Sequence, residues 1–367
     1  MNKFQKESTT FNDSSFDYLI LGAGLAGLTL AIELLKSGTK VCIIDIDRPG
    51  SGASGAPAGL MNPATSQKAR MPKDAIECIK AFEEMLDFVL GNNNSDVILS
   101  RKVLRPAVDE KLKENFVNSV LADQWPDDWI EWLENTRVSK LVDIQSYGGM
   151  LLHVAKGIDF RAWIRALDVK IDEMNGVRYY QCSYSIKSSS QGYQISTNYG
   201  DLSSKVIIDC TGSDLTNKTE YKFALVKGQT RVVSRPESLN LPVAISSYGY
   251  VLTDNLRVII GSTYEHKFES ILPTEKHDDQ ILKKSYLIQG FQPEKDQITE
   301  RWSGIRVSTP DRVPAIGPST NDKNLYLYFG LGSKGLFYSA YLSKVLANHL
   351  IHGDKVPPRF LPSRFLK

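Results

Sequence analysis

The 367-residue chain has few cysteines, no excess of either charge and no long hydrophobic run. Its four cysteines, Cys42, Cys78, Cys182 and Cys210, are far apart in the sequence. This spacing argues against a structural zinc site and a disulfide scaffold, and it suits a reducing compartment. The 44 basic and 42 acidic residues give a net charge of +2, so we expect no general attraction to nucleic acid or to a membrane.

The apolar segments are too short to cross a bilayer. The longest one, residues 18–32, contains three glycines. Residues 1–15 are polar and lack the apolar core of a signal peptide, so we expect them to form a flexible tail. These features predict a soluble, cytoplasmic protein with a hydrophobic content of 42%. The length suits about two domains.

The first chemical motif is a glycine-rich turn inside a strand–turn–helix–strand pattern. The apolar run 18–21 predicts a buried strand, and apolar residues at helical spacing predict a helix that ends near Ser37 and Gly38. A second buried strand is expected over 41–44, and Asp45 follows it. The turn between the first strand and the helix reads Gly22-Ala23-Gly24-Leu25-Ala26-Gly27.

Each part of this pattern can help to hold a dinucleotide. Gly22 and Gly24 allow the backbone to turn tightly and to approach a pyrophosphate, and Gly27 lets the helix pack close to the strand. The free N–H groups at the helix N-terminus attract phosphates. Asp45 can accept hydrogen bonds from ribose hydroxyls. The pattern predicts a nucleotide site but does not choose between NAD and FAD, and a purely structural turn is the alternative.

A segment of small residues follows Asp45. Residues 48–63 offer few side chains with which to build a core, so the backbone is suited to wrap around a ligand; a flexible surface loop is the alternative. At this segment the sequence resembles the FAD-dependent D-amino acid oxidase superfamily. Members of that family follow the second strand and its acid with a similar Ala-Ser-Gly segment that runs along the flavin.

Four more segments resemble the same family in the same order, so that the resemblance covers residues 16–367. They are the strand that ends in Thr211-Gly212, the Gly-x-Arg and Pro-Asp-x-x-Pro-x-x-Gly signature over 304–317, the glycine turn 330–336, and the chain end 358–365. Within the family they look most like the FAD-oxidase half of the bacterial bifunctional enzymes that make 5-methylaminomethyl-2-thiouridine in tRNA, with glycine oxidase-like proteins next. Those bifunctional enzymes carry a methyltransferase domain before the oxidase, where this chain has about 15 residues.

The resemblance implies roles for individual residues. Arg306 would bind the substrate carboxylate through a bidentate pair, with a structural salt bridge to Asp311 or a neighbour as the alternative. Tyr250 would help to hold the substrate, although a packing role is nearly as well supported. Lys334 and the helix start beside it would face the electron-rich edge of a reduced flavin; a solvated surface lysine is the alternative. Gly304 replaces the cysteine that binds flavin covalently in one branch of the family, so FAD should be non-covalent.

The expected FAD contacts come from all of these motifs. They are Gly22, Gly24, Leu25, Ala26, Gly27, Asp45, Ile46, Gly52, Ala53, Ser54, Gly55, Ala58, Gly59, Leu60, Met61, Thr211, Gly212, Arg306, Gly332, Ser333, Lys334, Gly335 and Leu336. None of the five histidines falls in a recognisable metal or nucleophile pattern, so no metal is expected.

The expected fold is α/β, with two interleaved domains. A Rossmann-like FAD-binding domain would comprise 16–63, 140–220 and 300–367, and an α+β substrate domain with an antiparallel sheet would comprise 64–139 and 221–299. Its expected elements are a helix over 74–90, a strand over 223–233, and a hairpin of 250–253 with 257–260. The indoles of Trp125, Trp129 and Trp132 favour a place in a core over a binding site.

The leading hypothesis is an FAD-dependent oxidoreductase that oxidises the C–N bond of an amine or amino acid. Glycine or an N-substituted glycine would pass a hydride to the flavin and leave an imine that water hydrolyses. Carboxymethylaminomethyl-uridine in tRNA is an alternative substrate, and Lys68, Arg70 and Lys73 could contact a polyanion, although such loop charges are usually only solvated. A non-catalytic flavin-binding module is an alternative of another class. An NAD-dependent dehydrogenase is disfavoured, and the sequence does not indicate an oligomeric state.

Overall fold

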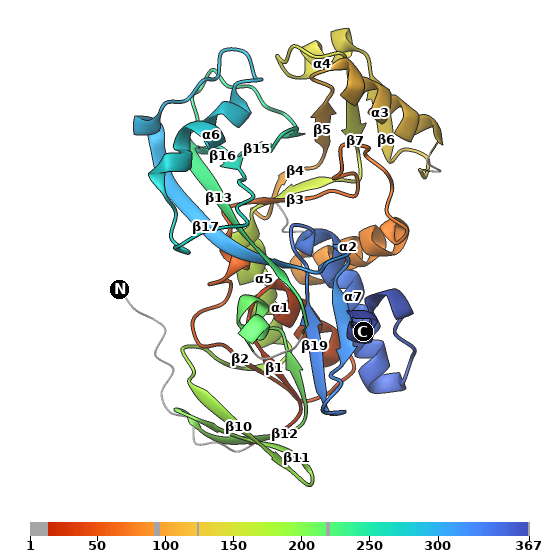
Figure 1. Ribbon diagram of the computed structural model, residues 1–367, viewed down its shortest axis with the longest axis vertical. Helices are drawn as coiled ribbons and strands as arrows, with labels where there is room; N and C mark the ends of the chain where they lie inside the picture. The colour runs from red at the N-terminus through yellow and green to blue at the C-terminus, as the bar shows by residue number, and fades with distance from the viewer. Residues whose placement is uncertain (1–13, 92–95, 123–124, 218–220, 366–367) are drawn as a thin grey trace.

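The computed structural model describes residues 14–91, 96–122, 125–217 and 221–365 (Figure 1). Most of the expected tail at 1–15 therefore lies outside the described residues, but Ser15 already belongs to the first strand. The ribbon has two lobes, and each lobe contains one large sheet (Figure 1). The described residues include no helix that is both long and apolar enough to span a bilayer.

The first large sheet contains the predicted nucleotide-binding strands. Its strand order is β10-β11-β12-β1-β2-β9, and β19 pairs with β12 and with β18. Parallel pairing joins β1 to β2, β1 to β12, and β12 to β19, so these strands end at the same edge. The strands are β1 (Ser15–Leu21), β2 (Val41–Ile44), β9 (Val177–Tyr179), β10 (Tyr184–Ser189), β11 (Gly192–Thr197), β12 (Gly200–Asp209), β18 (Ala315–Pro318) and β19 (Leu325–Phe329).

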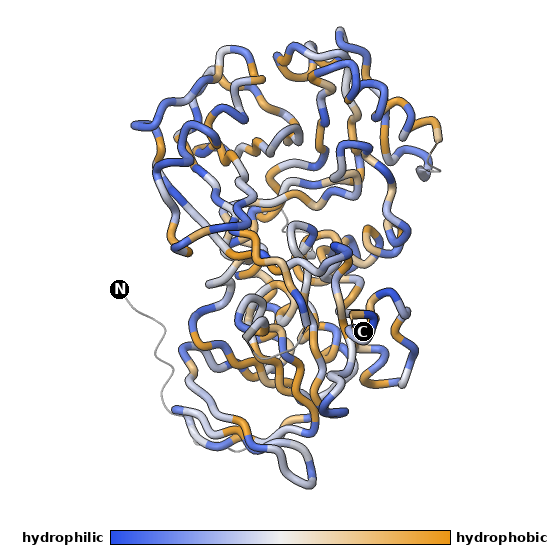
Figure 2. Tube along the Cα trace, viewed as in Figure 1, coloured by the Kyte–Doolittle hydropathy of each residue, from blue (hydrophilic) through white to orange (hydrophobic). Residues whose placement is uncertain are grey.

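Four helices form a core with this sheet. They are α1 (Leu25–Leu35), α2 (Ala75–Leu90), α5 (Phe160–Glu173) and α7 (Gly335–His352). Side chains alternate along β1, so that Tyr18 and Ile20 join the helix-covered core while Leu19 and Leu21 join a second core on the other face. Hydrophobic segments are concentrated at the centre of this lobe (Figure 2). The helix α1 is buried on nearly all sides, which explains why it is apolar all round.

The second large sheet is mostly antiparallel, with the strand order β17-β13-β16-β15-β14-β5-β7-β6. Its strands are β5 (Val103–Pro106), β6 (Ile130–Leu133), β7 (Gly149–Leu152), β13 (Ala224–Ser234), β14 (Ala244–Ser246), β15 (Tyr250–Thr253), β16 (Arg257–Gly261) and β17 (Ile298–Ser308). The helices α3 (Glu110–Ala122), α4 (Asn135–Leu141) and α6 (Asp278–Leu282) belong to this lobe (Figure 1). A small sheet of β3 (Gly59–Met61), β8 (Lys156–Ile158) and β4 (Ile98–Ser100) lies between the large ones (Figure 1).

The mixed α/β class and the main local elements were predicted correctly, including α2, β13 and the β15–β16 hairpin. Three segments differ from the expected domain boundaries. The strands β7 and β17 were assigned to the FAD-binding domain, but both lie in the second sheet. The helix α2 was assigned to the substrate domain, but it packs against α7 in the first core. An apolar face on a strand or helix shows that the element packs against another one, but it does not show which one. The packing partners of β7, β17 and α2 are decided by the tertiary structure.

Candidate active site

The glycine turn after β1 is built by close packing. Gly22 has φ +99°, and a Cβ atom on it would lie 2.7 Å from the carbonyl oxygen of Cys210. A Cβ on Gly27 would overlap the carbonyl oxygen of Gly22. By contrast, a Cβ on Gly24 would meet only the hydroxyl of Ser54, at 3.4 Å. Gly22 and Gly27 are therefore required by the protein's own packing, whereas a Cβ on Gly24 would make only one ordinary contact.

Asp45 braces this turn from the end of β2. One carboxylate oxygen accepts a hydrogen bond from the backbone N–H of Ala23 at 2.6 Å, and the other accepts one from the N–H of Asp47 at 2.8 Å. Burial raises the pKa of Asp45 in spite of these two hydrogen bonds. The expected ribose contact of Asp45 stays a prediction. Ile46, the next residue, is 63% exposed.

The small-residue segment folds back over the start of α1. Residues Ala53–Gly55 form a short 3-10 helix, and the hydroxyl of Ser54 accepts a hydrogen bond from the N–H of Leu25 at 3.0 Å. This 3-10 helix also contacts β17. Of the predicted FAD contacts in the segment, Gly52 is exposed, Ala53, Ser54, Gly55, Gly59 and Leu60 are half-buried, and Ala58 and Met61 are buried.

Two later segments meet the same region. Thr211 follows β12, and its Cα would lie 3.2 Å from a Cβ on Gly22; Gly212 is open to its surroundings. In the turn before α7, the N–H of Gly332 donates to the carbonyl oxygen of Val307 at 2.9 Å. A Cβ on Gly335 would lie 3.3 Å from the side chain of Leu25. The structure therefore brings together the glycine turn, segment 50–61, residues 211–212 and the turn 330–336.

Lys334 is the residue immediately before α7, and its ammonium group is 6.0 Å from the ring centroid of Tyr338. Burial lowers the pKa of Lys334, and the charge of Arg312 lowers it further. Its neighbour Ser333 is exposed, and Leu336, in the first turn of α7, is buried. The expected effect of Lys334 on a reduced flavin stays a prediction.

Arg306 reaches across its neighbouring strand. It lies on β17 opposite Val226 of β13, and its guanidinium passes over Gly228. Its Nη2 donates to the hydroxyl of Ser262 at 2.7 Å, and its Nη1 donates to the carbonyl oxygen of Thr263 at 3.3 Å. The guanidinium carbon lies 4.7 Å from the ring centroid of Tyr264.

Among the described residues, no carboxylate forms an ion pair with Arg306. The alternative salt bridge to Asp311 does not form, because Asp311 binds Arg364 at 2.9 Å. This ion pair ties the Pro-Asp-x-x-Pro segment to the chain end. The guanidinium of Arg306 therefore keeps its capacity to bind an external carboxylate.

Tyr250 lies on the same face of the second sheet as Arg306. Its hydroxyl is 3.0 Å from the hydroxyl of Thr230 and donates to the carbonyl oxygen of Ala58 at 3.3 Å. Burial raises the pKa of Tyr250, while Thr230 and the charge of Arg306 act in the opposite direction. Since Ala58 belongs to segment 50–61, Tyr250 joins the second sheet to the predicted flavin-binding segment.

Sequence reasoning missed the residues that surround the guanidinium, namely Ser262, Thr263 and Tyr264. One signal was available: Gly228 lies inside the predicted strand 223–233, and a glycine in a strand interior often marks a close approach. Here the group that approaches is the side chain of Arg306.

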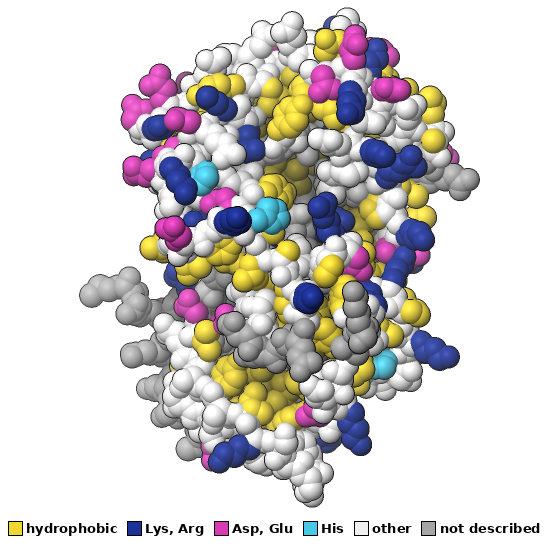
Figure 3. All heavy atoms as spheres, viewed as in Figure 1, with side chains coloured by type: hydrophobic (Ala, Val, Ile, Leu, Met, Phe, Trp, Pro, Cys, Tyr) yellow, Lys and Arg dark blue, Asp and Glu magenta, His cyan; other side chains and the backbone are white. Residues whose placement is uncertain are grey.

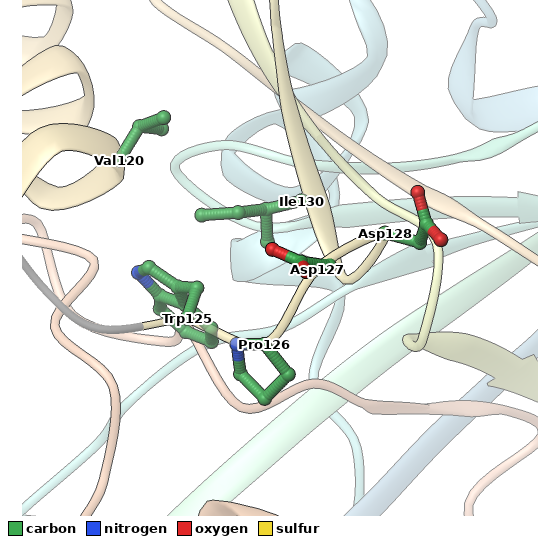
Figure 4. A pocket seen from close by; sticks show the side chains of 6 residues that line it. All are labelled: Val120, Trp125, Pro126, Asp127, Asp128 and Ile130. Carbon is green, nitrogen blue, oxygen red and sulfur yellow. The ribbon is translucent and has the colours of Figure 1, made fainter.

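Other candidate sites lie elsewhere. A cavity of about 540 Å³ opens beside β6, at the opposite edge of the second sheet from β17 (Figure 4). Its lining includes Trp125, so this indole is only partly in a core. Trp129 and Trp132 pack at the margins of two hydrophobic cores. The described residues contain no group of His, Cys, Asp and Glu side chains that could hold a metal ion.

Comparison with known proteins identifies the family. The family model described as FAD dependent oxidoreductase, DAO, matches residues 17–349. This chain belongs to the DAO family of FAD-dependent oxidoreductases. The bifunctional tRNA 5-methylaminomethyl-2-thiouridine biosynthesis protein of Acinetobacter baylyi is 24% identical to this chain. The match covers 95% of this chain and 56% of the Acinetobacter protein. The chain thus spans a little over half the length of this relative.

Solved structures show the same DAO fold. Glycine oxidase from Geobacillus kaustophilus superposes with a TM-score of 0.82 at 19% identity, and the match covers 96% of this chain and all of that one. Iminodiacetate oxidase from Chelativorans sp. BNC1 has a TM-score of 0.74 at 17% identity, with 94% and 98% of the two chains covered. At these identities the likeness shows the fold alone.

FAD is the cofactor of the DAO family, and the residues present fit it. The lack of a side chain at Gly24 and the N-terminus of α1 suit a pyrophosphate. A Cβ on Gly52 or on Gly212 would meet no heavy atom within 4 Å, so neither position is filled by the protein's own packing. The segments that would hold FAD are those that the structure brings together around the start of α1.

Proposed function

We propose that this DAO-family chain oxidises the C–N bond of an amino acid or amine that carries a carboxylate, of the glycine or N-substituted glycine type. The observation that carries the proposal is the guanidinium of Arg306, which has no carboxylate partner among the described residues and lies beside Tyr250 on the face toward segment 50–61. A bidentate carboxylate pair with Arg306 would fix one end of the substrate.

The protein groups supply binding and orientation. Arg306 would hold the carboxylate, and the hydroxyl of Tyr250, which is tied to Thr230 and Ala58, would limit where the amine lies. Bound FAD supplies a two-electron acceptor for the hydride that leaves the α-carbon. Hydride loss from the neutral amine would leave a protonated imine, which water would hydrolyse to a carbonyl compound and a protonated amine or ammonium. No general base is needed when the amine binds in its neutral form.

FAD would be bound without a covalent link. A Cβ on Gly304 would lie 2.6 Å from the indole of Trp302 and 3.1 Å from the Cα of Ala53. The backbone at Gly304 is therefore packed closely against Trp302 and against the backbone of segment 50–61. This packing leaves no room at position 304 for a side chain that could bond to the flavin ring.

Carboxymethylaminomethyl-uridine in tRNA is a second candidate substrate. It is supported by the name of the Acinetobacter relative and by the exposed Lys68, Arg70 and Lys73 just after segment 50–61. Acidic and basic side chains alternate on the face shown in Figure 3, so any such binding would rest on a local group of charges. Binding that weakens steeply as salt rises would support it, and no tRNA binding at low salt would exclude it.

The test is anaerobic reduction of the FAD-loaded protein by a panel of amines. We expect glycine, sarcosine or iminodiacetate to bleach the flavin absorbance, and Arg306→Lys to keep the colour but raise the KM about 10-fold or more. The control is Arg165→Lys, on the exposed surface of α5. If no amine in the panel, modified tRNA included, reduces the flavin, a non-catalytic flavin-binding module is the better description. Equal KM values for Arg306→Lys and the control would remove Arg306 from the proposal.

A further inference from the structure

Three consecutive residues surround the guanidinium of Arg306, and we call Ser262, Thr263 and Tyr264 the guanidinium cradle. The serine hydroxyl accepts one hydrogen bond, the threonine carbonyl oxygen accepts a second, and the tyrosine ring lies over the guanidinium carbon. All three contacts come from the segment that follows β16. The direction of Arg306 therefore depends on where this one segment lies relative to β13.

The cradle is held from the opposite face of β13. Gln229 donates its backbone N–H to the hydroxyl of Thr263 at 2.9 Å, and that hydroxyl donates to the Oε1 atom of Glu265 at 2.6 Å. The side-chain amide of Gln229 donates to the same Oε1 atom at 2.8 Å. One carboxylate oxygen thus joins the cradle to the strand.

Glu265 is fixed through its backbone as well. Its N–H and C=O both pair with Lys227 of β13 at 2.9 Å, so that the segment after the cradle continues along the strand. Its second carboxylate oxygen lies 3.2 Å from the ring Nε2 of His277. The Lys227 side chain, only 1% exposed, donates to the carbonyl oxygens of Ser270 and Leu272 and fastens the next loop.

This network is unusually polar for the interior of a sheet. Gln229 and Arg231 are fully buried on successive positions of the same face of β13 as Lys227. Apolar side chains could fill this volume with less desolvation, whereas polar side chains that hydrogen-bond to one another fix a single geometry. A cavity of about 890 Å³, lined in part by Lys227, Glu265 and His266, opens behind the network and leaves Glu265 close to solvent. A geometry fixed in this way is what a substrate-binding guanidinium needs.

We propose that Glu265 is a positioning residue, which holds the guanidinium cradle against β13 and so directs Arg306 toward the substrate carboxylate. The inference rests on the proposed function of Arg306. It assigns to Glu265 no contact with substrate or cofactor, because its carboxylate lies on the opposite face of the strand.

The experiment measures the Kd of small carboxylates, acetate, glycolate and benzoate, from the change they cause in the flavin spectrum of the FAD-loaded protein. Glu265→Ala removes the shared acceptor, and we expect the Kd to rise about 5- to 20-fold. Glu265→Gln retains a carbonyl oxygen for both donors and should restore binding to within about twofold of the parent. Glu269→Ala, on an exposed position of the same loop, is the matched control.

Two further readouts separate positioning from general damage. The flavin content of Glu265→Ala should stay close to that of Glu269→Ala, and its KM for a carboxylate substrate should rise more than its kcat falls. Where Glu265→Ala does not fold, Thr263→Val tests the same link, because it removes the hydroxyl and keeps the carbonyl oxygen.

The inference would be overturned if Glu265→Ala or Thr263→Val bound carboxylates with the same Kd as the control while Arg306→Lys still weakened binding. If Arg306→Lys also binds carboxylates normally, the proposed function fails as well.

Discussion

The close approach of Arg306 to Gly228 allows a substitution that moves the guanidinium without removing it. In Gly228→Ala, the new methyl group would overlap the Nη2 and Cζ atoms of Arg306 and lie 3.0 Å from its Nε atom. Carbon atoms settle at about 3.5–4.0 Å, so the guanidinium must shift by about 1–2 Å. A shift of this size breaks the 2.7 Å hydrogen bond to Ser262. The guanidinium would then no longer face a bound carboxylate correctly.

Misalignment of a charged hydrogen-bonded pair costs about 1.5–3 kcal/mol, or about 10- to 150-fold in affinity. We therefore expect Gly228→Ala to raise the Kd for small carboxylates and the KM for the substrate by that factor. The fold should tolerate the change, because the clash is with a flexible side chain end and Gly228 does not have a positive φ. Ala224→Ser, at an exposed position on the same face of β13, is the control. An unchanged Kd at equal flavin content would refute the close packing of Gly228 and Arg306.

Two further predictions concern the cofactor and the fold. Gly24→Val should fold but lose FAD, because its side chain would occupy the place expected for the pyrophosphate, and a fully flavin-loaded variant would contradict the cofactor site. Buried Asp278 has a lowered pKa: desolvation raises it, but hydrogen bonds from Arg301 and Arg231 outweigh that effect. Since the folded pKa lies below the ordinary value of 3.8, this stabilisation is present above that pH and is lost as the pH falls through the lower folded value. Asp278→Asn should lower the free energy of unfolding by about 3–5 kcal/mol at neutral pH and flatten its acid dependence in denaturant titrations; equal stability of variant and parent would contradict this.

The parts of the site that sequence alone predicts are those whose chemistry is local. The turn after β1 needs glycine at fixed spacing, and the packing around Gly22 and Gly27 shows this directly. The strand pair β15–β16 is also local, because its two strands are joined by a short turn. Such elements depend on neighbours a few residues away.

The guanidinium cradle could not be predicted in this way. Ser262 lies 44 residues before Arg306 in the sequence, and their contact depends on the register of β13 against both β16 and β17. The placement of β17 in the second sheet is a further example, since its 11 residues are only partly buried and do not identify their partner strand. Pairing between distant strands is decided by the whole fold.

The strand β17 has one more consequence for how the protein works. Its last residues pair with the turn before α7, through Ser308 with Leu331 and Val307 with Gly332, while Arg306 directly precedes them. The backbone of Arg306 is therefore tied, through the two residues that follow it, to the start of α7. A substitution that displaces one of these two segments should displace the other as well.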